Sequence, residues 1–303
     1  MKATVKPGFF IVGAPKSGTT SVYHYLKQHP EVYLPRIKEL NFFCTDLHFR
    51  FPLLDEQQFL AYYKDCKNEK AIGEVSVWNL CSKAAAQNIY QFNPDAKIII
   101  LLRNPADMMY ALHSNHVFND NEIIPGFEEA LNAQEERKQG LRISASIKCP
   151  VEGLYYFDVG AYAEQVRRYV QLFGQQQVRV ILFDDLAADT RNVYASLLKF
   201  IEVEEVMPDS FKQFNANKTT RSDLVKQLTV HTPAMLKSIG KWLFPHQSVR
   251  RDRLMYWLWK INTRESKRPA LDQELRKRIT ARMKDDIKSL EQLIGRDLSQ
   301  WRA

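Results

Sequence analysis

The residues with the clearest chemical meaning form a loop near the N-terminus, where positions 13–20 read Gly-Ala-Pro-Lys-Ser-Gly-Thr-Thr. An apolar segment of strand length precedes this loop and an amphipathic segment follows it, so backbone N–H groups would face an anion at a helix N-terminus. In an NTPase loop the lysine directly follows the second glycine. Here Thr19 stands in that place and Lys16 lies inside the loop. The spacing predicts a phosphate-type anion site that differs from an NTPase site.

A second charged residue follows the apolar segment at 97–102. In an NTPase the corresponding strand would end in an aspartate that holds magnesium. This segment ends in Arg103, whose planar guanidinium can bind an anion in a bidentate manner without a metal. The two features together predict a site for two anionic groups and no metal ion.

The elements that must position these residues follow from hydrophobic periodicity. Continuous apolar runs at 9–12, 97–102 and 178–183 are typical of strands buried on both faces, and amphipathic helices separate them. This alternation predicts an α/β fold, a P-loop-type parallel β-sheet flanked by helices. We expect a single domain over residues 1–303 with a helical C-terminal part. That part comprises a basic helical segment at 224–268 and a last helix at 270–295, which Gly295 ends.

Composition limits the class of protein. Four widely spaced cysteines without a Cys-x-x-Cys pair argue against a zinc site or a disulfide framework. The chain shows no signal peptide and no apolar run long enough to span a membrane, so we expect a cytoplasmic protein. Nine Lys/Arg against two acidic residues at 237–268 supply most of the net charge of +8. Aromatic residues interleave these charges, and the simplest interpretation is a pair of helices that pack the aromatics on the core and leave the charges in solvent. If the segment does more, we expect it to form the acceptor side of a site and to contact anionic lipid, with nucleic acid less favoured.

Several short motifs occur in a fixed order along nearly the whole chain. They are Pro-Lys-Ser-Gly-Thr-Thr-Ser at 15–21, Lys-Glu-Leu-Asn-Phe-Phe at 38–43, Arg-Asn-Pro at 103–105, Gly-Ala-Tyr at 160–162, the strand and Asp-Asp-Leu at 178–186, and the segment at 293–301. Together they resemble the motifs of sulfotransferases that use 3′-phosphoadenosine-5′-phosphosulfate (PAPS), in particular bacterial members with heparan-sulfate-type motifs. The resemblance implies PAPS as donor, 3′-phosphoadenosine-5′-phosphate as product and no required metal.

The resemblance also implies which residues bind the donor. The first loop corresponds to the family's 5′-phosphosulfate loop, and Arg103 begins its 3′-phosphate motif. The family's serine eight residues after that arginine is replaced by Ala111, so Ser114, one helical turn further on, is the substitute candidate. A later polar loop resembles the family's late phosphate-binding loop. The donor-binding residues predicted in this way are Pro15, Lys16, Ser17, Gly18, Thr19, Thr20, Ser21, Arg103, Ser114, Lys218, Thr219, Thr220 and Arg221.

Sulfuryl transfer requires stabilisation of the leaving phosphate and removal of the acceptor's proton. We expect Lys16 to stabilise the leaving phosphate, and the resemblance implies Glu39 as general base. Glu74 is a second carboxylate in the region that faces the acceptor in the family. His113 and His116 are alternatives, because aryl-type members use histidine as base. The expected acceptor contacts are Glu39, Glu74 and His113.

The sequence leaves the acceptor open. A hydroxyl or amine of a glycan, a lipid or a small molecule would each suit the chemistry, and no nucleic-acid partner is expected. Two other functions remain as alternatives, a P-loop nucleotide-dependent kinase and a non-catalytic binder of anions or membrane surfaces. The missing NTPase lysine and aspartate count against the kinase, and the binder rests on charge alone.

Overall fold

The computed structural model describes residues 5–212, 218–220, 263–266 and 268–302. The chain forms two compact units, one of residues 1–214 and 271–303 and one of residues 215–270. In the second unit, strand β6 (Lys218–Thr220) pairs antiparallel with β7 (Thr263–Glu265). Most of the predicted basic segment at 224–268, and Arg221 with it, lies outside the described residues.

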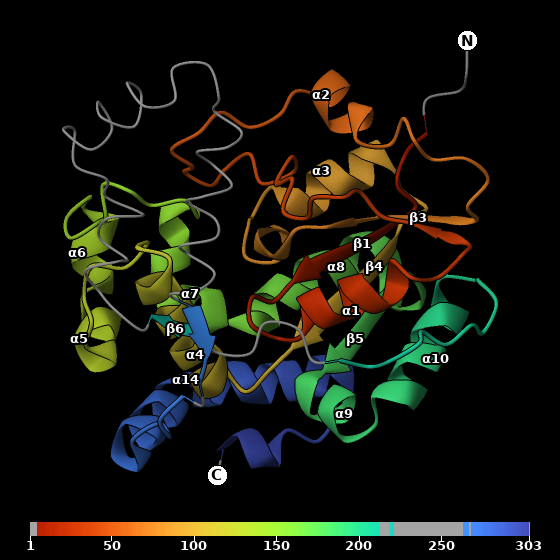
Figure 1. Ribbon diagram of the computed structural model, residues 1–303. Coiled ribbons are helices and arrows are strands. Elements are labelled where there is room, and N and C mark those ends of the chain that lie inside the picture. The colour runs from red at the N-terminus through yellow and green to blue at the C-terminus, as the bar shows by residue number, and fades with distance from the viewer. Residues whose placement is uncertain (1–4, 213–217, 221–262, 267, 303) are drawn as a thin grey trace, which may run out of the picture. The chain divides into compact units, whose positions relative to one another are not determined.

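The first unit is built on a five-stranded parallel sheet (Figure 1). The strands are β1 (Phe9–Gly13), β2 (Val32–Tyr33), β3 (Ala71–Val75), β4 (Lys97–Leu102) and β5 (Val178–Leu182), and their spatial order is β2-β3-β1-β4-β5. β1 lies in the middle, paired with β3 on one side and β4 on the other. The predicted fold class, a parallel sheet flanked by helices, is confirmed.

Alternation of side chains along the central strands creates two cores. Phe10 and Val12 of β1 pack with Ile98 and Ile100 of β4 into one cluster, and Phe9 with other residues of the same strands packs into a second cluster on the opposite face. All five residues of β1 are buried, as expected for a strand covered on both faces. Helices must therefore lie on both sides of the sheet.

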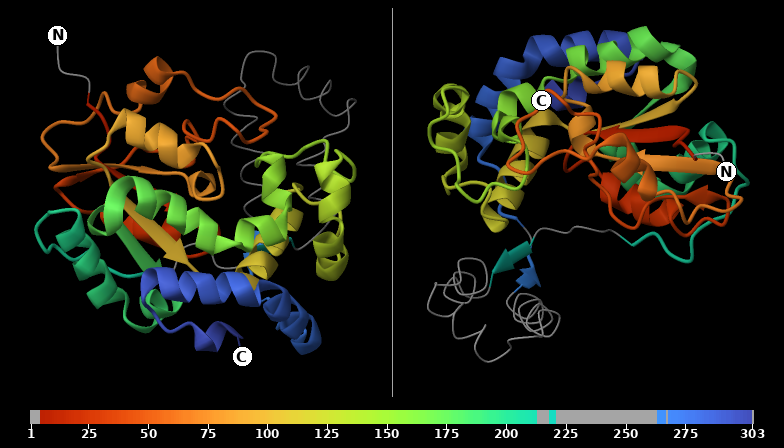
Figure 2. Two further views of the ribbon diagram at one scale, coloured as in Figure 1. Left: turned by 180° about the vertical axis from the view of Figure 1, so that it is seen from behind. Right: turned by 90° about the horizontal axis from the view of Figure 1, so that it is seen from above.

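One face of the sheet is covered by α3, α4, α8 and α14, and the other by α1, α9 and α10 (Figure 2). The helices and 3₁₀ turns of the described residues are α1 (Thr19–Leu26), α2 (Glu56–Ala61), η1 (Val77–Asn79), α3 (Ala85–Phe92), α4 (Pro105–Phe118), α5 (Phe127–Asn132), α6 (Gln134–Lys138), η2 (Val151–Leu154), α7 (Tyr156–Gly160), α8 (Tyr162–Gln177), α9 (Phe183–Ala188), α10 (Thr190–Phe200), α14 (Gln273–Ile294) and η3 (Ser299–Arg302). None of them is long and apolar enough to cross a membrane.

The C-terminal helix α14 returns to the first unit and packs on α8 and α4. Its buried stripe includes Ile279, Met283, Ile287 and Leu290, the spacing expected of an amphipathic helix. The helix ends where Gly295 adopts the left-handed conformation, with φ of 62°. The last residues of the chain thereby lie close to the segments that follow β4 and β5.

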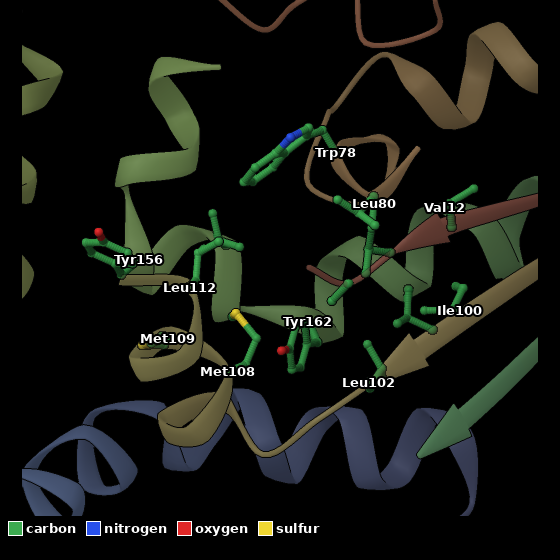
Figure 3. Close-up of a cluster of buried hydrophobic side chains, with 14 of the residues drawn as sticks. Val12, Trp78, Leu80, Ile100, Leu102, Met108, Met109, Leu112, Tyr156 and Tyr162 are labelled. Carbon is green, nitrogen blue, oxygen red and sulfur yellow. The ribbon is translucent and has the colours of Figure 1, made fainter. Parts of the chain in front are cut away.

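A cluster of buried side chains lies where β1 and β4 end (Figure 3). Leu80, in the segment after β3, and Val12 of β1 both belong to this cluster. Met108 of α4 lies near Tyr162 of α8 in the same view. This packing fixes the strand ends and the helices that follow them. The loops after β1 and β4 therefore start from a rigid base.

Candidate active site

The candidate site lies at the carboxyl ends of the parallel strands. β1 is followed by a connection toward β2 and β3, whereas β4 is followed by one toward β5 on the other side. Neighbouring strands whose connections leave in opposite directions mark the point where open α/β sheets bind ligands. The loop at 13–20 follows β1 and Arg103 follows β4, so the topology brings both predicted anion-binding features to this point.

The loop after β1 has the backbone conformation of an anion-binding turn. Lys16 and Gly18 both have positive φ, 58° and 94°, and α1 begins directly after them at Thr19. Ala14 N–H donates to the carbonyl of Leu101 on β4 at 2.6 Å, which ties the loop to the neighbouring strand. The hydroxyl of Ser17 is buried and donates to the carbonyl of Pro15 at 3.3 Å. The Ser17 side chain thus stabilises the turn, and the start of α1 supplies N–H groups for an anion.

The two glycines of the loop have different roles. A Cβ atom at Gly13 would lie 2.5 Å from Cβ of Leu80, so this glycine permits the packing of the segment after β3. Gly18 is required by its left-handed φ, and a Cβ there would also lie 2.9 Å from the side chain of Leu186. The expectation that glycine admits an anion close to the backbone therefore applies to Gly18 more than to Gly13.

Arg103 lies beside the loop, as its position in the sequence predicts. Its Nη1 donates to the carbonyl of Lys16 at 3.4 Å, and its guanidinium carbon lies 4.7 Å from the ring centre of Phe183. The guanidinium is half-buried between the loop backbone and this ring. A cation fixed against an aromatic face keeps its plane oriented, which suits the recognition of an anionic oxygen group.

Residues near the C-terminus contact the turn that follows Arg103. Trp301 Nε1 donates to Asp184 at 3.0 Å, and the carbonyl of Trp301 accepts from the side-chain amide of Asn104 at 3.4 Å. Arg296 pairs with Asp185 at 2.9 Å. The Asp-Asp segment after β5 thus contacts the last residues of the chain. Their role in the first unit is to position the turns after β4 and β5.

Lys38, for which the sequence predicted no role, connects the loop to the predicted base. Its Nζ donates to Oγ1 of Thr20 at 3.0 Å and lies 3.1 Å from Oε1 of Glu39. Both charged side chains are partly exposed. This ammonium group therefore brings the carboxylate of Glu39 to the edge of the anion-binding loop.

Glu39 is fixed by the backbone as well as by Lys38. Its N–H donates to the carbonyl of Val75 at 2.8 Å, and its Oε2 accepts from the N–H of Val77 at 2.9 Å. Glu39 and Asn41 both have left-handed φ, 65° and 53°. The residues at the end of β3 determine these two left-handed conformations. The carboxylate of Glu39 is therefore held in one orientation.

The two histidines lie inside the protein. The Nε2 atom of His113 is 2.9 Å from the carbonyl of Ile124, and its ring packs against Phe127. His116 is 2% exposed, its ring stacks on Trp78, and burial lowers its pKa to about 3. A base with so low a pKa removes a proton poorly at neutral pH. Both histidine rings are thus buried in the first unit, and the predicted acceptor contact of His113 remains a prediction.

Two groups of residues are predicted to bind the 3′-phosphate of the donor. Ser114 donates to the carbonyl of Tyr110 at 2.9 Å, within α4, while Ala111 is buried. Lys218, Thr219 and Thr220 form β6 of the second unit. Their roles at the 3′-phosphate remain predictions.

Glu74, the second predicted carboxylate, is 1% exposed. It lies on β3 next to Phe10 of β1 and accepts hydrogen bonds from the Ser76 hydroxyl and, at 3.3 Å, from the Asn79 amide. Burial is the main cause that raises its pKa to about 8. Among the described residues, no group of three His, Cys, Asp or Glu side chains is arranged to hold a metal ion.

The fold is an α/β fold with a glycine-containing loop after β1 and an arginine after β4, at the carboxyl ends of neighbouring strands. The chain belongs to the sulfotransferase family, because the family model for the sulfotransferase domain matches residues 6–290.

Solved and curated relatives agree with this family. A crystal structure of a sulfotransferase from Alicyclobacillus acidocaldarius superimposes with a TM-score of 0.73 and 31% identity, covering 99% of this chain and 100% of that chain. Carbohydrate sulfotransferase 15 of Mus musculus is 22% identical in an alignment of 248 residues that covers 65% of this chain and 44% of the relative. Bifunctional heparan sulfate N-deacetylase/N-sulfotransferase 1 of Xenopus laevis is 24% identical in an alignment of 221 residues that covers 66% of this chain and 23% of the relative. The match thus spans less than half the length of these curated relatives.

Proposed function

We propose that this sulfotransferase transfers the sulfuryl group of PAPS to a hydroxyl or amine, with Lys16 stabilising the leaving phosphate and Glu39 acting as general base. The observation that carries the proposal is the Lys38 contact, which joins Thr20 of the loop to Glu39. Transfer requires donor and base within reach of one acceptor atom. Family membership favours this reaction over the nucleotide-dependent kinase and the non-catalytic binder.

The residues present fit a donor with two anionic ends. The loop offers N–H groups at the start of α1 and the ammonium group of Lys16, and Arg103 offers a fixed guanidinium beside it. Bound PAPS would supply the activated sulfuryl group. Lys16 would neutralise charge that develops on the leaving phosphate, which is the main requirement in a loose transfer transition state.

Proton removal from the acceptor is assigned to Glu39. The N–H of Val77 binds its Oε2, so Oε1 is the oxygen directed toward Lys38 and the loop. An acceptor hydroxyl or amine that reaches the sulfuryl group from this side would meet Oε1. Lys38 can then release Oε1 and contact the transferred oxygens, because the ammonium group lies at the loop already.

A glycan is the acceptor class that the curated relatives favour. Their names refer to carbohydrate and to heparan sulfate. Lipids and small molecules with hydroxyl or amine groups would satisfy the same chemistry. Labelling of a panel of such acceptors with radioactive donor identifies the class.

The donor site is tested by calorimetry with adenosine 3′,5′-bisphosphate in the presence of EDTA. Wild-type protein is expected to bind with a micromolar Kd, and Arg103→Ala to weaken binding by about tenfold or more, because it removes a charge-assisted contact. Arg191→Ala, an exposed arginine of α10, is the matched control and should bind as the wild type does. Absence of binding to the wild type, or strict dependence on Mg²⁺, would refute the proposed donor.

A further inference from the structure

Glu74 is a buried carboxyl group without a cationic partner. It is 1% exposed, and no ion pair is recorded for it in the described part of the chain. A buried carboxylate that lacks a counter-ion is strongly disfavoured, and such a group takes up a proton instead. The upward pKa shift, caused chiefly by burial, agrees with a neutral group. Glu74 is therefore unsuited to act as an ionised ligand or as a second base.

Hydrogen bonds lead from Glu74 to the segment that presents Glu39. The hydroxyl of Ser76 is bonded to Glu74 and also accepts the N–H of Asn41 at 3.0 Å. The side-chain amide of Asn41 in turn donates to the carbonyl of Glu39 at 2.9 Å. Ser76 and Asn41 are themselves buried, so these bonds are shielded from water.

The hydrogen bonds of this cluster are compatible with a neutral Glu74. The Ser76 hydroxyl and the Asn79 amide both contact the carboxyl oxygens of Glu74. A proton on Glu74 adds one donor, so the Ser76 hydroxyl can accept from Glu74 instead of donating to it. The contact between Glu74 and Ser76 is therefore kept when Glu74 is protonated.

The segment at 39–41 depends on such support. Glu39 and Asn41 adopt left-handed backbone conformations that non-glycine residues rarely populate. These conformations persist only where surrounding bonds determine them. Three hydrogen bonds to this segment come from the end of β3 and the two residues after it, namely from Val75, Ser76 and Val77. Ser76 is the one whose orientation Glu74 sets.

We infer that Glu74 is a positioning residue, a neutral carboxylic acid that fixes Ser76 and thereby holds the left-handed turn at 39–41 so that Glu39 faces the donor loop. The inference rests on the proposed role of Glu39. It replaces acceptor contact as the role of Glu74, since both carboxyl oxygens are buried and engaged by Ser76 and Asn79.

A pair of substitutions distinguishes the neutral from the ionised role. Glu74→Gln keeps the length of the side chain and its ability to donate to Ser76 but cannot ionise. Glu74→Asp keeps the carboxyl group but shortens the side chain, so it cannot reach Ser76 in the same geometry. A neutral positioning group predicts that Glu74→Gln is the more active variant by about tenfold in kcat, because Glu74→Asp misplaces the base.

The variants are assayed with labelled PAPS and N-desulfated heparan sulfate, which offers both hydroxyls and amines. Ser76→Ala should lower kcat as Glu74→Asp does, and calorimetry should give all three variants the wild-type affinity for adenosine 3′,5′-bisphosphate. This split between kcat and donor affinity separates positioning of the base from loss of fold. The inference is overturned if Glu74→Asp is the more active variant, or if both substitutions lower kcat equally.

Thermal unfolding of the same variants at pH 8 separates failure of the inference from failure of the proposed function. If the wild type transfers no label to any acceptor, the proposed function fails. The order of stability still decides the inference in that case. Glu74→Gln should be at least as stable as the wild type and more stable than Glu74→Asp. The reverse order would overturn it.

Discussion

Substitution of Glu74 by glutamine should change how the stability of the protein depends on pH. Burial holds the pKa of Glu74 at about 8 in the folded state, against an ordinary value of 4.5. Below pH 4.5 the carboxyl is protonated in both states. Between these values the unfolded chain loses the proton while the folded protein keeps it, so wild-type stability falls as pH rises. Above pH 8 the folded group ionises too, and the loss is complete.

The magnitude follows from the two pKa values. At about 1.36 kcal/mol per pH unit, the interval from 4.5 to about 8 corresponds to a loss on the order of 5 kcal/mol in the free energy of unfolding. Glutamine does not titrate, so Glu74→Gln should lack this component. The groups that influence Glu74 electrostatically are Glu39 and Lys38, with Cys44, Tyr63 and Tyr169 nearby, and both proteins share them.

Urea unfolding of both proteins between pH 5 and pH 9 measures the effect. The quantity of interest is the difference in free energy of unfolding between Glu74→Gln and wild type at each pH, in which other titrations cancel. This difference should grow in favour of Glu74→Gln as pH rises and level off above pH 8. A flat difference, or a wild type that gains stability with rising pH, would mean that Glu74 is ionised in the folded protein.

Substitutions at three further positions test the site. Glu39→Gln should retain bisphosphate affinity in calorimetry while kcat falls about 10²- to 10⁴-fold, because it removes the general base; undiminished turnover would exclude Glu39. Lys38→Met should lower kcat about tenfold yet change the free energy of unfolding by less than about 1 kcal/mol, since the pair with Glu39 is partly exposed. Lys38→Arg should recover part of the rate. Equal rates for the wild type and both Lys38 variants would contradict the role of Lys38 at the site. Gly18→Ala should destabilise the protein by about 1–2 kcal/mol in urea unfolding, because φ of 94° and the nearby Leu186 oppose a side chain; a neutral effect would mean that the loop adopts another conformation.

The sequence predicted the parts of the fold that depend on continuous burial. β1, β4 and β5 lie at the predicted apolar runs, but the edge strand β5 is buried only at its last two residues, and Arg179 within it is exposed. β3 was not predicted as a strand, because Ala71–Val75 contains a glycine and a glutamate. The structure explains both exceptions. A Cβ at Gly73 would lie 2.1 Å from the Phe9 ring, and Glu74 is buried beside polar groups that satisfy it.

The positions of the candidate site residues follow from the sequence where one segment defines them, and not where tertiary contacts define them. The loop with Lys16 and the position of Arg103 follow from single segments of sequence. The role of Lys38 depends on a left-handed backbone at Glu39, which no sequence rule assigns to a glutamate. Burial of His113 likewise depends on packing from distant elements, which its own segment does not predict.

Transfer of ³⁵S from labelled PAPS is the most direct test of the central claim that the loop and Glu39 perform sulfuryl transfer. Wild type and Lys16→Ala are incubated with a panel of glycan, lipid and phenol acceptors in EDTA, and label in the acceptor and release of 3′-phosphoadenosine-5′-phosphate are both measured. The wild type should label at least one acceptor class without metal, and Lys16→Ala should reduce the rate by about 10²-fold or more, because Lys16 stabilises the leaving group. Equal rates for the two proteins, or phosphoryl transfer from Mg²⁺-ATP in place of sulfuryl transfer, would contradict the account.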